Sequence, residues 1–123
     1  MKIRAKEYIS KLIENVKVSQ CLYEVSHFQE TLNSESQIPE FYGIVGIETS
    51  LTHPECMVFL EPRSSKQKFL TVAELKQEFL KNKILPQDFM TFVVRSQRRA
   101  LEDPKIDRVS VVPSKKSVNV YFK

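Results

Sequence analysis

The chain has 123 residues, of which 41% are hydrophobic and 28% are charged, the composition of an ordinary globular protein, so we expect one domain spanning residues 1–123. It contains only two glycines, Gly43 and Gly46, which excludes the glycine-rich loops that hold nucleotide phosphates. No apolar stretch approaches the ~18 residues of a membrane span. No signal peptide is visible, so we expect no membrane association and a cytoplasmic protein, or a nuclear one in a eukaryote.

Charge is distributed unevenly along the chain. Residues 1–62 carry five Lys and Arg against nine Glu, a net charge of −4, whereas residues 63–123 carry fourteen Lys and Arg against six Asp and Glu, a net charge of +8. A strongly basic segment is the electrostatic signature of proteins that bind nucleic acid. The acidic first half is expected either to face a cationic partner or to neutralise the basic half of the same molecule.

Helical spacing of apolar residues predicts a helix at the start of the chain. The stripe consists of Ala5, Tyr8, Ile9, Leu12, Ile13 and Val16, with charged residues between them. Residues 18–32 fit two alternatives. Their apolar residues also recur at helical spacing, whereas the β-branched and aromatic content around Leu22–Phe28 would suit a strand. We favour a second helix, which would give the N-terminal segment a surface for a homodimer.

The middle of the chain reads as a β-hairpin followed by helices. Two runs rich in β-branched and aromatic residues, Phe41–Leu51 and Cys56–Leu60, predict paired strands. Thr71 and Glu74 form a capping box that starts a helix. The buried face of this helix is expected to consist of Val72, Leu75, Phe79 and Leu80.

The last third of the chain is predicted to hold one more helix and a second hairpin. Pro86 suits a first helical turn, and helical spacing of Phe89, Val93, Gln97 and Ala100 predicts a helix that ends at Asp103-Pro104. Residues 106–112 and 118–122 read as two strands around a turn at 113–117. The predicted fold class is therefore α+β: an N-terminal helical segment, a β-hairpin, and a winged-helix-like helix–helix–hairpin half over residues 63–123.

The basic half suggests a nucleic-acid interface. Its residues are Arg95, Gln97, Arg98 and Arg99 on the predicted basic helix and Lys115 and Lys116 at the hairpin tip. On a helix the three arginines would point away from the apolar stripe, and the guanidinium group bonds bidentately to phosphate or guanine. We therefore predict a non-enzymatic nucleic-acid-binding protein, on the condition that these cations form one continuous exposed strip. The alternative is a protein-interaction adaptor or assembly subunit with a charge-split docking surface.

Other site chemistry has weaker support in the sequence. Cys21, His27, His53 and Cys56 are potential zinc ligands, but they lack the paired spacing of structural zinc sites. Cys56 could be a nucleophile only with a histidine brought close by the fold, and no oxyanion-binding motif accompanies it. We therefore expect no metal, no cofactor and no catalytic activity, and two reduced thiols.

Overall fold

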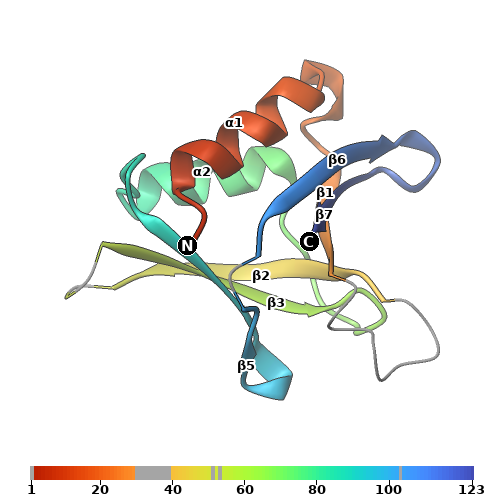
Figure 1. Ribbon diagram of the computed structural model, residues 1–123. Helices are drawn as coiled ribbons and strands as arrows, with labels where there is room; N and C mark the ends of the chain where they lie inside the picture. The colour runs from red at the N-terminus through yellow and green to blue at the C-terminus, as the bar shows by residue number, and fades with distance from the viewer. Residues whose placement is uncertain (1, 30–39, 51, 53, 103) are drawn as a thin grey trace.

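The computed structural model describes residues 2–29, 40–50, 52, 54–102 and 104–123. Seven strands form one curled mixed sheet in the order β5-β4-β3-β2-β1-β7-β6, and the two α-helices lie on the same side of it (Figure 1). The elements in chain order are α1 (Ala5–Asn15), η1 (Val18–Gln20), β1 (Glu24–Gln29), β2 (Tyr42–Thr49), β3 (Glu55–Pro62), α2 (Val72–Lys81), β4 (Phe89–Val94), η3 (Arg95–Gln97), β5 (Arg99–Ala100), β6 (Ile106–Val112), η4 (Pro113–Lys115) and β7 (Ser117–Phe122).

The predicted winged-helix-like layout is wrong. The helix expected after Pro86 is instead β4, a short 3-10 turn and β5. Met90, Phe92 and Val94 are buried, whereas the residues that alternate with them are half-buried. This strand has apolar residues on both faces. It therefore lacks the alternation of apolar and polar residues by which a strand is usually recognised in a sequence. Parallel pairing with β3 decides in favour of the strand.

The second N-terminal helix is also wrong, because Glu24–Gln29 forms β1, in agreement with the strand alternative for this region. Four local predictions are confirmed: the first helix, the β2–β3 hairpin, the capping box and the β6–β7 hairpin. In the capping box the Glu74 N–H donates to the Thr71 hydroxyl and the Thr71 N–H donates to the Glu74 carboxylate, both at 3.1 Å. These elements have strong local signals, so they form as the sequence predicts.

The core lies between the sheet and the helices. α1 buries Ala5, Tyr8 and Leu12 against the sheet. Tyr8 stacks on His27 of β1, and both rings contact Phe92 of β4. His27 points toward the helices. Because successive residues of a strand point to opposite faces, its neighbour Ser26 points to the other face of the sheet, away from the helices.

The segment between β3 and α2 crosses the sheet between β1 and β2. Among the described residues, these two strands pair only at Ser26–Gly43 and His27–Tyr42. Beyond that point the backbone of Leu70 bridges them: its N–H donates to Ile44 O in β2, and its carbonyl accepts from Val25 N–H in β1. The preceding residue, Phe69, lies against Gly43, because a Cβ at Gly43 would come within 2.3 Å of the Phe69 ring.

The close approach of Phe69 predicts that Gly43→Ala destabilises the protein. A methyl group at Gly43 would overlap the buried ring, and overpacking of this kind costs about 1–3 kcal/mol. Gly46→Ala is the matched control, since its Cβ would meet nothing nearer than Phe59 Cδ2 at 3.9 Å. Urea denaturation of both variants should show a lower midpoint for Gly43→Ala only. Equal midpoints would contradict the proposed packing.

Candidate interaction surfaces

The turn between β4 and β5 brings together four of the predicted interface residues. Arg95 and Gln97 lie in η3, Arg98 follows it, and Arg99 begins β5. All four are exposed. Within the described residues, none of the three guanidinium groups forms an ion pair, and that of Arg95 lies 5.8 Å from the ring centroid of Phe59. The turn therefore presents three arginines to solvent without the predicted α-helix.

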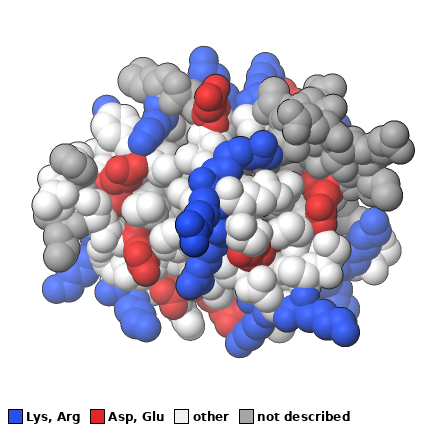
Figure 2. Space-filling view, turned by 90° about the horizontal axis from the view of Figure 1, so that it is seen from below, with Lys and Arg blue, Asp and Glu red and all other residues white. Residues whose placement is uncertain are grey.

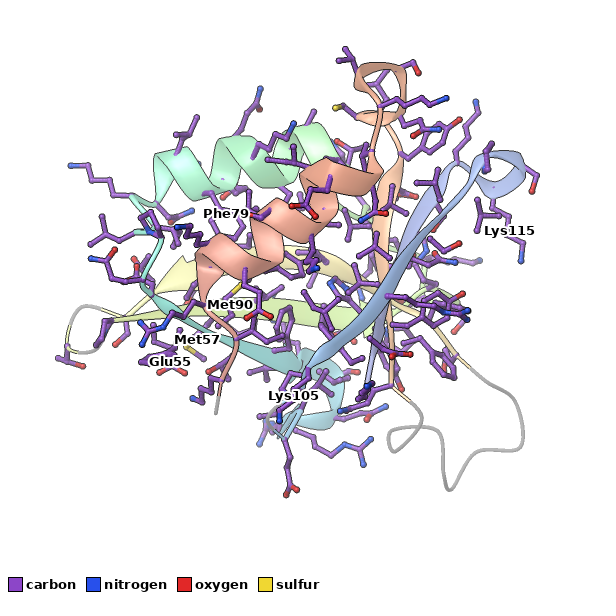
Figure 3. All side chains as sticks on the ribbon, turned by 45° about the horizontal axis from the view of Figure 1, so that its top comes forward. Glu55, Met57, Phe79, Met90, Lys105 and Lys115 are labelled. Carbon is purple, nitrogen blue, oxygen red and sulfur yellow. The ribbon has the colours of Figure 1, made fainter. Side chains whose placement is uncertain are left out.

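The two lysines of the predicted interface lie elsewhere. Lys115 and Lys116 are exposed in the turn between β6 and β7. β5 and β4 form one end of the sheet order, and β7 and β6 form the other. The two hairpins consequently point in different directions (Figure 1), with Lys115 near the far end of the β6–β7 turn in Figure 3. The expectation of one continuous cationic strip is wrong, because the β4–β5 turn extends below the sheet while the β6–β7 turn extends to its side (Figure 1).

Charge is mixed on the face toward which the β4–β5 turn points. Figure 2 shows a streak of Lys and Arg side chains across the middle of this face, with Asp and Glu side chains on both sides of it. Some of the acidic first half is neutralised locally. Glu24 pairs with Arg63 at 3.0 Å and Glu55 pairs with Lys2 at 2.9 Å. On this face, the charge split along the sequence therefore does not appear as separate acidic and basic areas.

Left-handed backbone conformations coincide with cationic residues. Among the described residues, the non-glycine positions with positive φ are Lys83, Arg98 and Lys116, with φ of 54°, 49° and 49°. A residue with a Cβ pays roughly 1–2 kcal/mol in this conformation, which glycine avoids. The chain therefore keeps a cation at three positions where glycine would be less strained, and residues held in this way tend to occur at functional sites.

Of the potential zinc ligands in the described residues, His27 and Cys56 are buried in separate structural roles, and Cys21 is half-buried. His27 is 1% exposed. Its Nδ1 must donate to the carbonyl of Tyr42 at 3.3 Å, so the neutral ring accepts at Nε2 from the Tyr8 hydroxyl at 2.6 Å. Burial lowers the pKa of His27 to about 4 and raises that of Tyr8. Burial, assisted by Asp88 and Glu55, raises the pKa of the Cys56 thiol to about 12, which disfavours the reactive thiolate.

No cluster of three or more potential metal ligands occurs in the part of the chain that the structure describes. His53, which was considered as a ligand, lies outside the described residues.

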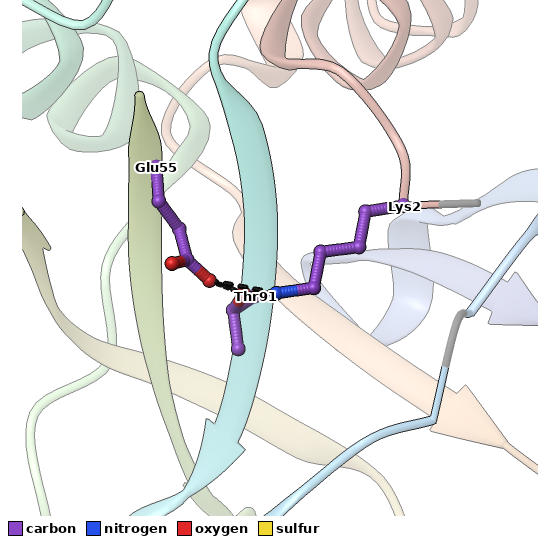
Figure 4. Close-up of polar contacts among 3 residues, drawn as sticks. All are labelled: Lys2, Glu55 and Thr91. Carbon is purple, nitrogen blue, oxygen red and sulfur yellow. Dashed lines mark hydrogen bonds and ion pairs between the residues drawn. The ribbon is translucent and has the colours of Figure 1, made fainter. Parts of the chain in front are cut away.

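A polar cluster on the outer face of the sheet joins the N-terminal segment to two strands. Lys2 Nζ donates to the Thr91 hydroxyl and to a carboxylate oxygen of Glu55, both at 2.9 Å, and the Thr91 hydroxyl donates to the same carboxylate (Figure 4). The N–H of Met90 donates to the carbonyl of Ile3 at 2.8 Å. Since Lys2 acts as a donor in an ion pair, it is not placed to take a proton from Thr91. The cluster fastens the chain terminus to β3 and β4.

A hollow near the end of β7 has a cationic lining but does not form an anion site. It has a volume of about 380 Å³ and is lined by Lys2, Lys105 and Lys123 among others. Lys2 is paired with Glu55, and Lys123 lies 3.6 Å from Asp107. Two of its three cations are therefore already neutralised.

The helix layer carries an apolar groove that the sequence did not predict. We define the helix layer as α1, α2 and the segments 16–23 and 82–88 that follow them. The groove has a volume of about 280 Å³. It is lined on one side by Lys6, Ile9 and Ser10 of α1 and on the other by Phe79, Ile84 and Leu85. Figure 3 shows the Phe79 side chain between the two helices.

Leu80, which follows the lining residue Phe79 in the sequence, was expected to be buried, but it is 81% exposed. On a helix of 3.6 residues per turn Leu80 lies about 100° from Phe79, at the edge of the apolar stripe. The prediction was wrong because it counted this edge position as part of the buried face. The available signal was the apolar run Phe79-Leu80 at the end of a helix, followed by Ile84-Leu85. This is more apolar surface than one buried stripe of the helix needs.

Comparison with known proteins does not identify a relative. No family model matches the chain, and the comparisons with curated proteins and with solved structures found no match. Neither α1 nor α2, the α-helices of the described residues, combines the length and apolar character needed to cross a membrane. The function must therefore be inferred from the surfaces themselves.

The buried neutral His27 predicts that the protein loses stability in mild acid. With a pKa of about 4 in the fold against an ordinary value of 6.5, the ring takes up its proton more readily in the unfolded chain. Stability contributed by the neutral ring is present above pH 6.5 and decreases toward pH 4, by about 3 kcal/mol. The measurement is the free energy of unfolding from chemical denaturation at several pH values in this range. His27→Gln is the control: its stability should depend less on pH, because glutamine does not titrate.

An NMR titration of the folded protein provides a direct second measurement. The imidazole signals of His27 should remain those of a neutral ring down to about pH 5. A midpoint near 6.5, the ordinary value for the group, would contradict the buried hydrogen-bonded assignment.

Proposed function

We propose that the protein is a non-enzymatic interaction module that binds a partner protein through its helix layer. The observation that carries the proposal is the location of the exposed apolar side chains. Five large ones are exposed among the described residues, and all belong to the helix layer: Ile13, Val18, Leu22, Leu80 and Leu85. The other large apolar side chains of the described residues are buried or half-buried.

Exposure on this scale favours a binding surface. Val18 is 91% exposed and Leu80 is 81% exposed, so folding of one chain gains little from burying either side chain. Scattered exposed apolar residues are ordinary, but a group of them on one side of a molecule beside an apolar groove is typical of an interaction site. Leu85 lines the groove, whereas Leu22 lies beside the start of α2 at the other end of the helix layer. A partner that extends along the helices would bury both.

The charges beside the groove favour a different protein over a second copy of this chain. In a two-fold symmetric dimer the same patch meets itself. Lys6 lines the groove, and Lys81 and Lys83 lie in the segment that carries Leu80 and Leu85. A dimer through this surface would bring these lysines together, and like charges across an interface oppose association.

Nucleic-acid binding through the β4–β5 turn is a second candidate. It is favoured by one observation: three exposed arginines without ion pairs to described residues, one of them in a left-handed conformation. The argument from one long basic strip no longer holds, because Lys115 and Lys116 lie in a different turn. We therefore place this candidate after protein binding.

Site-specific photo-crosslinking tests the proposed function. A photoreactive amino acid at Leu80 or Leu85 in the full chain, expressed in its natural host, should give a discrete crosslinked protein. The same group at the exposed Ser114 of the β6–β7 turn is the control, and it should not give that product. Products that are the same at all three positions, absent from both leucine positions, or formed only with a second copy would contradict the proposal.

Salt-dependent gel shifts test the second candidate. Three phosphate contacts would give a slope of about −3 for the logarithm of duplex affinity against the logarithm of salt concentration. Arg98→Gly should relieve the strained backbone and reduce the slope to about −2. Lys116→Gly makes the same backbone change in the other turn and should leave the slope unchanged. The absence of a shift at ~50 mM salt would contradict this candidate.

A further inference from the structure

The groove of the helix layer has an apolar lining with one lysine, and the chain segment on its other side is basic. Ile9, Phe79 and Ile84 contribute apolar side chains to its lining, and Lys6 is the only charged residue among the described residues that line it. The run from Phe79 to Gln87, which supplies the other side of the groove, carries Lys81 and Lys83 and no acidic residue. These two lysines do not line the hollow itself; together with Lys6 we call them the rim lysines. The next acidic residue, Asp88, is buried, and its carboxylate accepts from the Leu85 N–H at 2.9 Å.

The rim lysines are available to a ligand. Lys6, Lys81 and Lys83 are exposed, and within the described residues none of them forms a salt bridge. Glu78, the nearest acid in the sequence on α2, accepts a hydrogen bond from Asn82 Nδ2 at 3.1 Å. The positive charge beside the groove therefore has no described carboxylate paired with it.

Lys83 adds an independent observation. It follows the end of α2 with φ of 54°, a left-handed position where glycine is the preferred residue. Its N–H donates to Leu80 O and the N–H of Ile84 donates to Phe79 O, so the turn places Ile84 at the groove. Glycine would support the same turn with less strain, whereas only a cation adds charge at this point of the rim.

We propose that the groove binds an amphipathic segment of a partner protein that carries apolar residues on one side and Asp or Glu beside them. This inference rests on the proposed function and specifies the chemistry of the partner. Apolar side chains would enter the groove between α1 and α2, as in helix-in-groove recognition. The acidic side chains would lie against the three rim lysines and fix the orientation of the segment.

The apolar side chains around the hollow favour a peptide segment over a small molecule. A small molecule would fill a hollow of about 280 Å³ and leave the exposed apolar side chains of the helices uncovered. Exposed apolar side chains follow the lining residues on both helices: Ile13 lies one helical turn after Ile9 on α1, and Leu80 directly follows Phe79 on α2. A segment of about two helical turns would contact the hollow and its flanks together.

Peptide binding to the full chain tests this inference. The probe is a fluorescent amphipathic peptide with Leu at i, i+3, i+4 and i+7 and Glu on the flanking positions, and its partner probe has Lys in place of every Glu. By anisotropy the acidic peptide should bind at least about tenfold tighter than the basic one at low salt. Leu80→Ser should weaken binding of the acidic peptide without loss of fold, because that side chain is already exposed.

Charge reversal at the rim provides the matched comparison. Lys81→Glu with Lys83→Glu should weaken the acidic peptide about threefold to tenfold, as expected for two exposed charge pairs. Lys115→Glu with Lys116→Glu makes the same net change in the distant β6–β7 turn and should have no effect. Equal effects of both double variants would overturn the inference in favour of general charge attraction.

The failure of this inference can be separated from failure of the proposed function. If both peptides bind equally, or neither binds while crosslinks from Leu80 persist, the acidic partner is wrong and protein binding by the helix layer stands. If crosslinks from Leu80 and Leu85 are absent as well, both proposals fail.

Discussion

The fold depends on the point where β1 and β2 separate and the backbone of Leu70 joins them. Without this bridge, Val25 N–H and Ile44 O would lack their described partners in the sheet, and buried unpaired backbone groups are costly. The bridge is continued by Val72 N–H, which donates to Tyr23 O, and by Ala73 N–H, which donates to Cys21 O. The start of α2 is therefore fastened to the start of β1, and Gly43 permits this path by leaving room for Phe69.

The position of α2 determines which surfaces the molecule exposes. Because α1 and α2 lie on the same side of the sheet (Figure 1), their apolar flanks meet at a groove that the sheet does not cover. The strand order separates the exposed arginines from Lys115 and Lys116, since the β4–β5 and β6–β7 turns belong to different edges of the sheet. The same topology thus gathers apolar side chains and separates positive charges, which is why protein binding is better supported than a nucleic-acid strip.

Local sequence signals predicted the elements whose information is contained in a few neighbouring residues. The stripe of α1, the capping box of α2 and the two hairpins each combine a clear periodicity with a recognisable end. The wrong prediction of a helix after Pro86, where the structure has β4 and β5, has a specific cause. Val93 and Phe89 are apolar on the outer face of β4, so both a helix and a strand have an apolar side there, and pairing with β3, about thirty residues earlier, decides between them.

The residues of the candidate surfaces were likewise predicted only in part from the sequence. The sequence by itself determined that Arg95, Arg98 and Arg99 would be close together, because they are near neighbours in the chain. They are exposed as expected, but in a turn between two strands and not on the outer side of a helix. It also determined the amphipathic character of α1 and α2. Only the tertiary structure decided that Lys115 and Lys116 lie at a separate edge, that His27 is buried beside Tyr8, and that Leu80 remains exposed. Each of these depends on contacts between residues distant in the chain, which local propensity does not encode.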